Sequence, residues 1–150
     1  PKALGALLAC VGLGQFLMFA ILRKTDRWHY RLSPLVLFQA LGMGALLIFF
    51  ANRWVPLFGA AFLALGLCAG FCYFSSLYYS LHRQEEKGRT SGFHESILAA
   101  AISVGPLIGG TLARSHGLRA PYVVCFIVFA VGIAGEVAMK TLRAGRPLPS

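Results

Sequence analysis

Five long apolar blocks, separated by polar or charged spacers, make up almost all of this chain. They run from about Leu4 to Leu22, Pro34 to Ala51, Trp54 to Leu81, Gly92 to Ala113 and Pro121 to Leu142. Four have roughly the 20 residues that a helix needs to cross a hydrocarbon core of about 30 Å, and the third is longer, so it can tilt or protrude. The apolar residues are continuous, whereas strands of a membrane barrel alternate. The pattern predicts an all-α membrane protein with five transmembrane helices.

The composition supports this prediction and indicates which kinds of partner to expect. The chain of 150 residues is 57% hydrophobic and 13% charged, whereas soluble domains are about 25% charged. The lipid bilayer is therefore the expected surrounding. The net charge of +9 is explained by membrane topology and contact with anionic lipid, so no nucleic-acid partner is expected.

Basic residues are divided unevenly between the two sides that five spans define. One side holds ten of them: Arg23, Lys24, Arg27, Arg31, Arg83, Lys87, Arg89, Lys140, Arg143 and Arg146. The other side holds four: Lys2, Arg53, Arg114 and Arg119. Cytoplasmic loops carry the excess of Lys and Arg. We therefore expect a multi-pass protein of the inner (plasma) membrane with a cytoplasmic carboxyl terminus.

The chain is expected to form one transmembrane domain over residues 1–150, with a short cytoplasmic tail at 143–150. It starts with Pro1 in place of Met, so we expect a piece of a longer protein. The cysteines all lie inside apolar blocks, where thiols behave as small apolar groups: Cys10, Cys68, Cys72 and Cys125. Neither a metal site nor a cofactor is expected.

The spacer after the first block contains a lone aspartate among basic residues. Asp26 and Arg27 form either a solvated pair or a gate that holds one conformation. With Arg31, they resemble a worn copy of the inner-loop motif G-x-L-a-D-R-x-G-R-R of the major facilitator superfamily. The two glycine positions of that motif are occupied here by Leu22 and His29.

The spacer before the fourth block strengthens the resemblance. The run 86–92, which includes Gly88 and Arg89, is similar to the facilitator loop E-x-G-R-x-x-G, and residues 105–110 are similar to the helix signature G-P-x-x-G-G. The resemblance implies helices eight to twelve of a twelve-helix facilitator-type bundle, with helices two to six as the alternative. It also implies secondary transport of a small solute by alternating access, with the remaining helices of the same transporter as partners.

Small residues define one face of the fourth block. Ala101, Gly105 and Gly109 recur every four residues, beside Pro106 and Gly110. Small residues let transmembrane helices approach closely, and proline removes a helix hydrogen bond and can kink the span. The face is either a moving interface or a static packing surface.

Glu136 is the carboxylate deepest in a block. Ionisable groups inside a span are costly and are candidates for function. A proton-coupling role would suit Glu136, so the solute transport could be proton-coupled. In the alternative interpretation Lys140, four residues later, neutralises it.

Other polar residues also fall within the blocks. His94 and Glu95 enter the fourth block and form either a helix-dipole contact or a gating pair. Gln15 and Tyr73 are the preferred substrate-path positions within a larger set that also contains Gln39, Ser75, Ser76, Tyr78 and Ser103.

No set of catalytic residues is apparent in the sequence, and we do not expect an enzyme. Two alternatives to a transporter stay open. One is an intramembrane enzyme with His94, Glu95 and Glu136 as its polar centre. The other is a non-catalytic membrane scaffold subunit.

Overall fold

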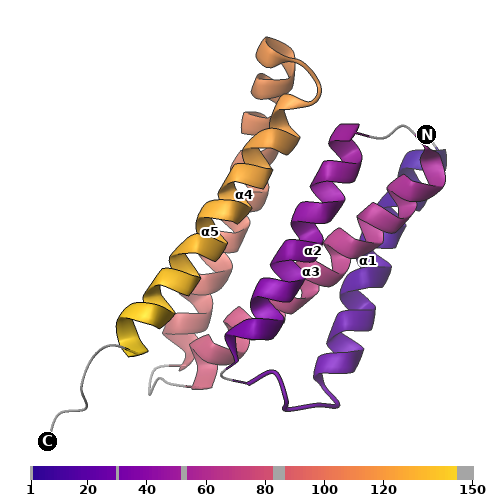
Figure 1. Ribbon diagram of the computed structural model, residues 1–150. Helices are drawn as coiled ribbons and strands as arrows, with labels where there is room; N and C mark the ends of the chain where they lie inside the picture. The colour runs from indigo at the N-terminus through magenta and orange to yellow at the C-terminus, as the bar shows by residue number, and fades with distance from the viewer. Residues whose placement is uncertain (1, 30, 52–53, 83–86, 145–150) are drawn as a thin grey trace, which may run out of the picture.

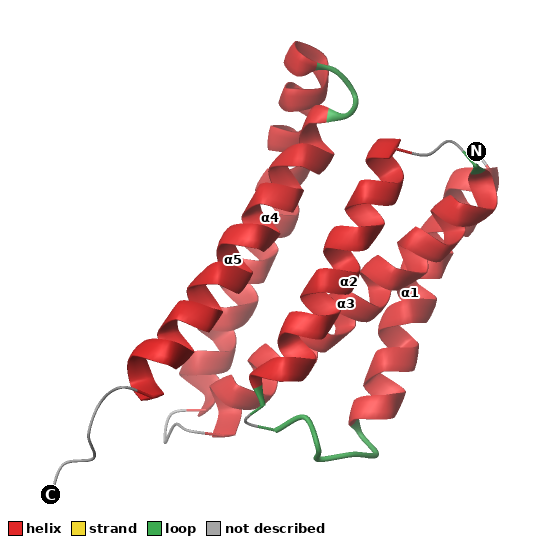
Figure 2. Ribbon diagram, viewed as in Figure 1, coloured by secondary structure: helices red, strands yellow, loops and turns green. Residues whose placement is uncertain are grey.

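The computed structural model describes residues 2–29, 31–51, 54–82 and 87–144 (Figure 1). Five helices account for nearly all of them, and no strand occurs in these ranges (Figure 2). The helices are α1 (Lys2–Leu22), α2 (Leu32–Ala51), α3 (Val55–His82), α4 (Lys87–His116) and α5 (Ala120–Ala144). All five are long and apolar enough to cross a membrane, so the described chain has the architecture of a multi-pass helical membrane protein.

The fourth helix begins earlier than the apolar pattern predicts. We expected a start at about Gly92 with Gly88 and Arg89 in a loop, but α4 begins at Lys87, so both residues lie in its first turn. The 30 residues of α4 extend roughly 45 Å at about 1.5 Å per residue. Hydrogen bonds within the helix satisfy its backbone groups whatever the side chains are. A helix can therefore extend beyond its apolar segment, and hydropathy alone places the start of α4 too late.

The closest helix contact is the crossing of α1 and α3. A Cβ atom on Gly66 would overlap the carbonyl oxygen of Val11, and one on Gly14 would lie 2.5 Å from the carbonyl oxygen of Leu63. A Cβ on Gly70 would lie 3.1 Å from Cα of Gln15. These three glycines allow the two backbones to touch, as small residues do in membrane helix pairs.

Two apolar clusters join α1, α2, α3 and α5. One contains Met18, Leu22, Trp28 and Phe71 and lies near the α1–α2 loop. The second contains Ala45, Leu46, Phe49 and Ala61 from α2 and α3, with Tyr122, Phe126 and Phe129 of α5 packed against it. Helix α5 therefore docks on α2, and α4 contacts α3 and α5.

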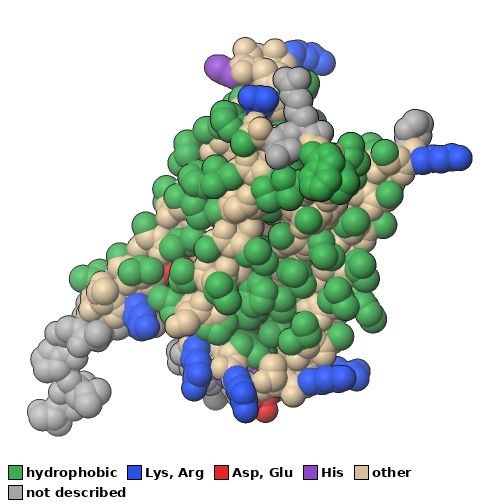
Figure 3. All heavy atoms as spheres, turned by 45° about the vertical axis from the view of Figure 1, so that its right-hand side comes forward, with side chains coloured by type: hydrophobic (Ala, Val, Ile, Leu, Met, Phe, Trp, Pro, Cys, Tyr) green, Lys and Arg blue, Asp and Glu red, His purple; other side chains and the backbone are tan. Residues whose placement is uncertain are grey.

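The two ends of the bundle differ in charge. The α1–α2 loop, the end of α3, the start of α4 and the end of α5 lie at the same end (Figure 1). Lys and Arg side chains gather there, below a broad apolar face (Figure 3). The described basic residues therefore follow the uneven distribution that the sequence predicts.

Candidate functional site

A hydrogen bond between α2 and α5 joins two polar side chains within the spans. Gln39 Nε2 donates to Glu136 Oε1 over 2.9 Å. Gln39 lies seven residues after the start of α2 and Glu136 eight residues before the end of α5. Both therefore lie roughly 10 to 12 Å from the loop end of the bundle. This bond places a carboxylate and an amide together at membrane depth.

The pair opens onto a cavity of about 290 Å³ between α2, α3 and α5. The cavity is lined by polar, aromatic and apolar side chains: Trp28, Arg31, Leu35, Gln39, Phe71, Cys72, Ser75, Ser76, Tyr79 and Glu136. Glu136 also borders a neighbouring groove with Lys140. Glu136 and Lys140 form no salt bridge in the described chain, and Glu136 Oε2 has no hydrogen-bond partner there. The neutralising pair that the sequence allows is thus not formed.

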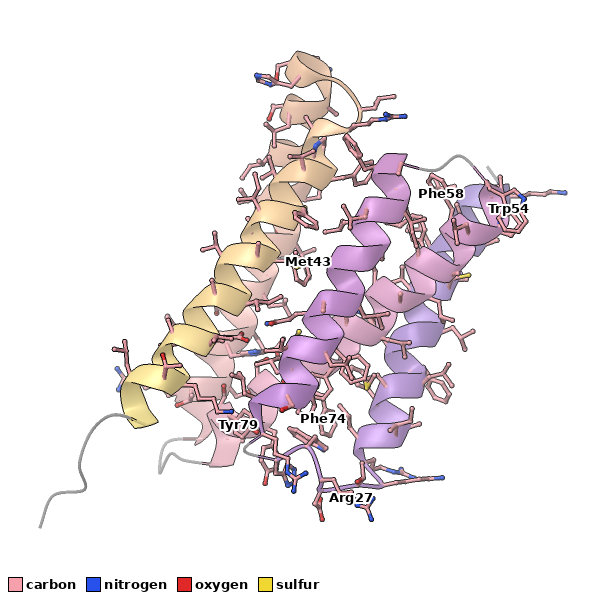
Figure 4. All side chains as sticks on the ribbon, in the orientation of Figure 1. Arg27, Met43, Trp54, Phe58, Phe74 and Tyr79 are labelled. Carbon is pink, nitrogen blue, oxygen red and sulfur yellow. The ribbon has the colours of Figure 1, made fainter. Side chains whose placement is uncertain are left out.

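Trp28, from the α1–α2 loop, lines the cavity. Its side chain is only 4% exposed, and its ring packs edge-on against Phe71, Phe74, Tyr78 and Tyr79. Figure 4 shows Phe74 and Tyr79 at this end of the helices. Trp28 therefore anchors the α1–α2 loop to α3 and contributes to the lining of the cavity.

A second polar cluster joins α3 to α4. Tyr73 donates from its hydroxyl to Glu95 Oε1 over 3.0 Å. Ser76 Oγ lies 2.8 Å from His94 Nε2, and His94 Nδ1 lies 3.4 Å from Glu95 Oε1. The structure thus brings Tyr73, predicted as a substrate-path position, to the predicted pair His94 and Glu95. Ser76 also lines the cavity, so the two polar sites adjoin across α3.

Ser76, His94 and Glu95 stand in the order of groups used in nucleophilic catalysis, hydroxyl to imidazole to carboxylate. Such catalysis also needs donors aimed at an oxyanion. Ser76 lies within α3, whose backbone N–H groups bond within the helix, and its hydroxyl also donates to the Tyr73 carbonyl over 2.9 Å. The hydroxyl, imidazole and carboxylate are therefore in place, but no free backbone N–H in the described chain lies beside the Ser76 hydroxyl to stabilise an oxyanion.

The three residues of the first loop motif, Asp26, Arg27 and Arg31, have different surroundings in the structure. The Asp26 side chain is 94% exposed, and its Oδ1 lies 3.8 Å from His29 Nδ1. Asp26 forms no ion pair with an arginine within the residues described here. Arg27 donates from its backbone N–H to Thr25 Oγ1 over 3.4 Å, while Arg31 lines the cavity. Arg31 is thus the motif residue that reaches the candidate site.

The small-residue face of α4 is open. A Cβ atom added to Gly105, Gly109 or Gly110 would meet nothing within 4 Å in the described chain, and Ala101 is exposed. Helix α4 continues through Pro106. Gln15 lies at the α1–α3 crossing and does not line the cavity.

Three features escaped the sequence analysis in whole or in part. Gln39 was noted among the polar residues but ranked below Gln15 and Tyr73. Trp28 carried a signal, since an aromatic residue stands within a charged spacer. The run from Gly66 to Gly70 has the spacing G-x-x-x-G of close helix pairs, and we attributed that role only to α4.

Comparisons of the chain with protein-family models, curated proteins and solved structures find no match. Within the described residues, five helices long and apolar enough to cross a membrane, with a cavity between α2, α3 and α5, define the class of a multi-pass helical membrane protein.

Proposed function

We propose that this chain is part of a secondary transporter of the major facilitator type, which moves a small solute across the inner membrane by alternating access. The observation that best supports this proposal is the Gln39–Glu136 hydrogen bond beside a cavity of about 290 Å³ within the spans. Polar groups at membrane depth mark substrate and ion paths. No catalytic role is proposed for this site.

The open face of α4 supports the same proposal. Gly105 and Gly109 leave a flat surface that nothing covers within the described chain. The remaining helices of the transporter would pack there, and Pro106 would ease bending of α4 as the two halves rock. The basic end of the bundle would face the cytoplasm.

Glu136 is the proposed coupling group, because a carboxylate with one unpaired oxygen in the spans can take up a proton. The test uses the full-length protein in proteoliposomes with an imposed pH gradient and no nucleotide. We expect gradient-driven uptake from a panel of small solutes, lost when a protonophore collapses the gradient. Glu136→Gln should flatten the pH dependence of uptake, and Cys125→Ser, an exposed change on the same helix, should not.

Two results would count against the proposal. Absence of uptake of every solute by a correctly inserted full-length protein would favour the scaffold alternative. An unchanged pH profile in Glu136→Gln would remove Glu136 from proton coupling and leave transport itself standing.

One observation favours the second candidate, an intramembrane hydrolase. It is the Ser76–His94–Glu95 order, with 2.8 Å between Ser76 Oγ and His94 Nε2. A fluorophosphonate probe, which reacts with activated serines, tests it. We expect no labelling, since the hydroxyl lacks neighbouring oxyanion donors. Labelling that disappears in Ser76→Ala would favour the enzyme.

A further inference from the structure

Three buried polar atoms at one cavity lack a hydrogen-bond partner in the described structure. They are Trp28 Nε1, Gln39 Oε1 and Glu136 Oε2, and all three residues line the cavity between α2, α3 and α5. More than about 90% of buried polar groups in folded proteins are paired. A ligand of the cavity could supply the missing partners, namely donors for the two oxygens and an acceptor for the indole N–H.

At the Gln39–Glu136 end of the cavity, the unpaired atoms are hydrogen-bond acceptors. Gln39 Nε2 is engaged with Glu136 Oε1, which holds Gln39 Oε1 and Glu136 Oε2 in the same region with their lone pairs unused. A carboxylate inside a span is stabilised best by a positive partner. An ammonium group has three donors and a positive charge, so it can serve both oxygens at once.

At the Trp28–Arg31 end of the cavity, the polar groups are hydrogen-bond donors, so a ligand must supply an acceptor there. Trp28 Nε1 and the guanidinium of Arg31 can only donate. Arg31 precedes Gln39 by eight residues, roughly 12 Å along a helix axis, and the length of the arginine side chain shortens that gap. A carboxylate fits these donors, because arginine binds carboxylates through two parallel hydrogen bonds.

The other residues that line the cavity are only partly apolar. Leu35 and Phe71 lie among them together with the hydroxyl groups of Ser75, Ser76 and Tyr79, and Phe71 is 2% exposed. The cavity volume of about 290 Å³ is roughly twice that of a ~150 Å³ cavity that holds benzene. A solute with a short aliphatic side chain would fill this space.

We propose that the cavity binds a small amphoteric solute, with its ammonium at Gln39 and Glu136 and its carboxylate at Trp28 and Arg31. This inference rests on the proposed transport function and names its substrate class. Binding and uptake are measured separately, so that either can fail without the other.

The test is equilibrium binding of radiolabelled leucine to the full-length protein in detergent. Leucine carries both charged groups, whereas 3-methylbutylamine lacks the carboxylate and 4-methylpentanoate lacks the ammonium. We expect each analogue to compete at least about tenfold more weakly than leucine, since a hydrogen bond to a charged group is worth that factor or more.

Variants assign the two ends. Glu136→Gln should reduce the ratio of the affinities for leucine and 4-methylpentanoate. Arg31→Gln should reduce the ratio of the affinities for leucine and 3-methylbutylamine. Trp28→Phe keeps the ring but removes the N–H donor, and should weaken leucine binding about tenfold. The matched controls are Trp54→Phe, whose side chain is 66% exposed at the opposite end of the bundle (Figure 4), and Lys24→Gln in the exposed loop. Both should bind leucine normally.

The outcomes separate the two proposals. Equal competition by all three compounds, or no leucine binding to a folded protein, would overturn the amphoteric site. So would normal binding by Trp28→Phe and Glu136→Gln together. Uptake of another solute without leucine binding would leave transport standing and end this inference. Leucine binding without uptake of any solute would support the amphoteric site and contradict the transport proposal.

Discussion

Gln39 and Glu136, 97 residues apart in the chain, are joined by a hydrogen bond of 2.9 Å between α2 and α5. The bond uses one oxygen of the carboxylate, and the other oxygen is buried without a hydrogen-bond partner in the described structure, in a residue that lines the cavity. It therefore both ties two helices together and presents a polar group to the interior of the bundle.

The first prediction tests what this bond contributes to stability. Gln39→Leu removes the amide that donates to Glu136 Oε1, which should lower the free energy of unfolding by about 1 to 3 kcal/mol. A double-mutant cycle with Glu136→Met should give a coupling of about 1 kcal/mol, within the range of interhelical hydrogen bonds in membranes. Unfolding in mixed micelles, followed by circular dichroism, measures both.

Lys140→Met is the control for that cycle. Lys140 lines a groove beside Glu136 without an ion pair to it in the described structure, so its loss should change stability by less than about 0.5 kcal/mol. A larger loss in Lys140→Met than in Gln39→Leu would show that Lys140 is the true partner of Glu136.

The second prediction concerns the α1–α3 crossing. Gly66→Ala places a methyl group against the Val11 carbonyl oxygen, and overpacking of this kind costs about 1 to 3 kcal/mol. Gly105→Ala, where a Cβ meets nothing within 4 Å in the described chain, should unfold like the wild type. Equal stability of the two variants would contradict the close approach of α1 and α3.

The third prediction concerns the Trp28 anchor. Trp28→Ala removes a ring that contacts four aromatic side chains of α3, with an expected cost of about 3 to 5 kcal/mol. The α1–α2 loop should then open more often, so trypsin should cut after Arg23, Lys24 or Arg27 sooner. Trp54→Ala, which changes an exposed side chain, should leave the cleavage rate unchanged, and faster cleavage in both variants would argue against a specific anchor.

The fourth prediction concerns the open face of α4. Gly109→Leu should block uptake by the full-length transporter, because a bulky side chain would separate α4 from the helices that we propose to cover it. Insertion should be normal, since nothing in the described chain lies within 4 Å of a Cβ at this position. Gly12→Leu, equally open on α1, is the control. Normal uptake by a well-inserted Gly109→Leu protein would exclude a moving interface at this face.

The fifth prediction concerns orientation. In a cysteine-free background of the full-length protein, Arg23→Cys should resist an impermeant thiol reagent added to intact cells, and Arg119→Cys should react. The reason is the excess of basic residues on the side of Arg23. Labelling of Arg23→Cys from outside would reverse the proposed topology.

The structure also separates what could be read from the sequence from what could not. The five helices follow from apolar blocks of membrane-spanning length, and the predicted bounds differ from α1, α2, α3 and α5 by no more than two residues at each end. Only α4 deviates more, because polar residues near a membrane surface continue a helix that hydropathy ends early. The facilitator resemblance stays a prediction.

By itself, the sequence determined how many apolar helices there are and which ends carry the positive charge, because both depend on local composition and on the thickness of a bilayer. Only the tertiary structure decided that Gln39 meets Glu136, that Trp28 packs against α3 beside a cavity and that Gly66 lies against Val11. Those contacts depend on which helix faces which neighbour. In continuously apolar helices the hydropathy pattern marks no inner face, so packing geometry alone selects the residues that meet.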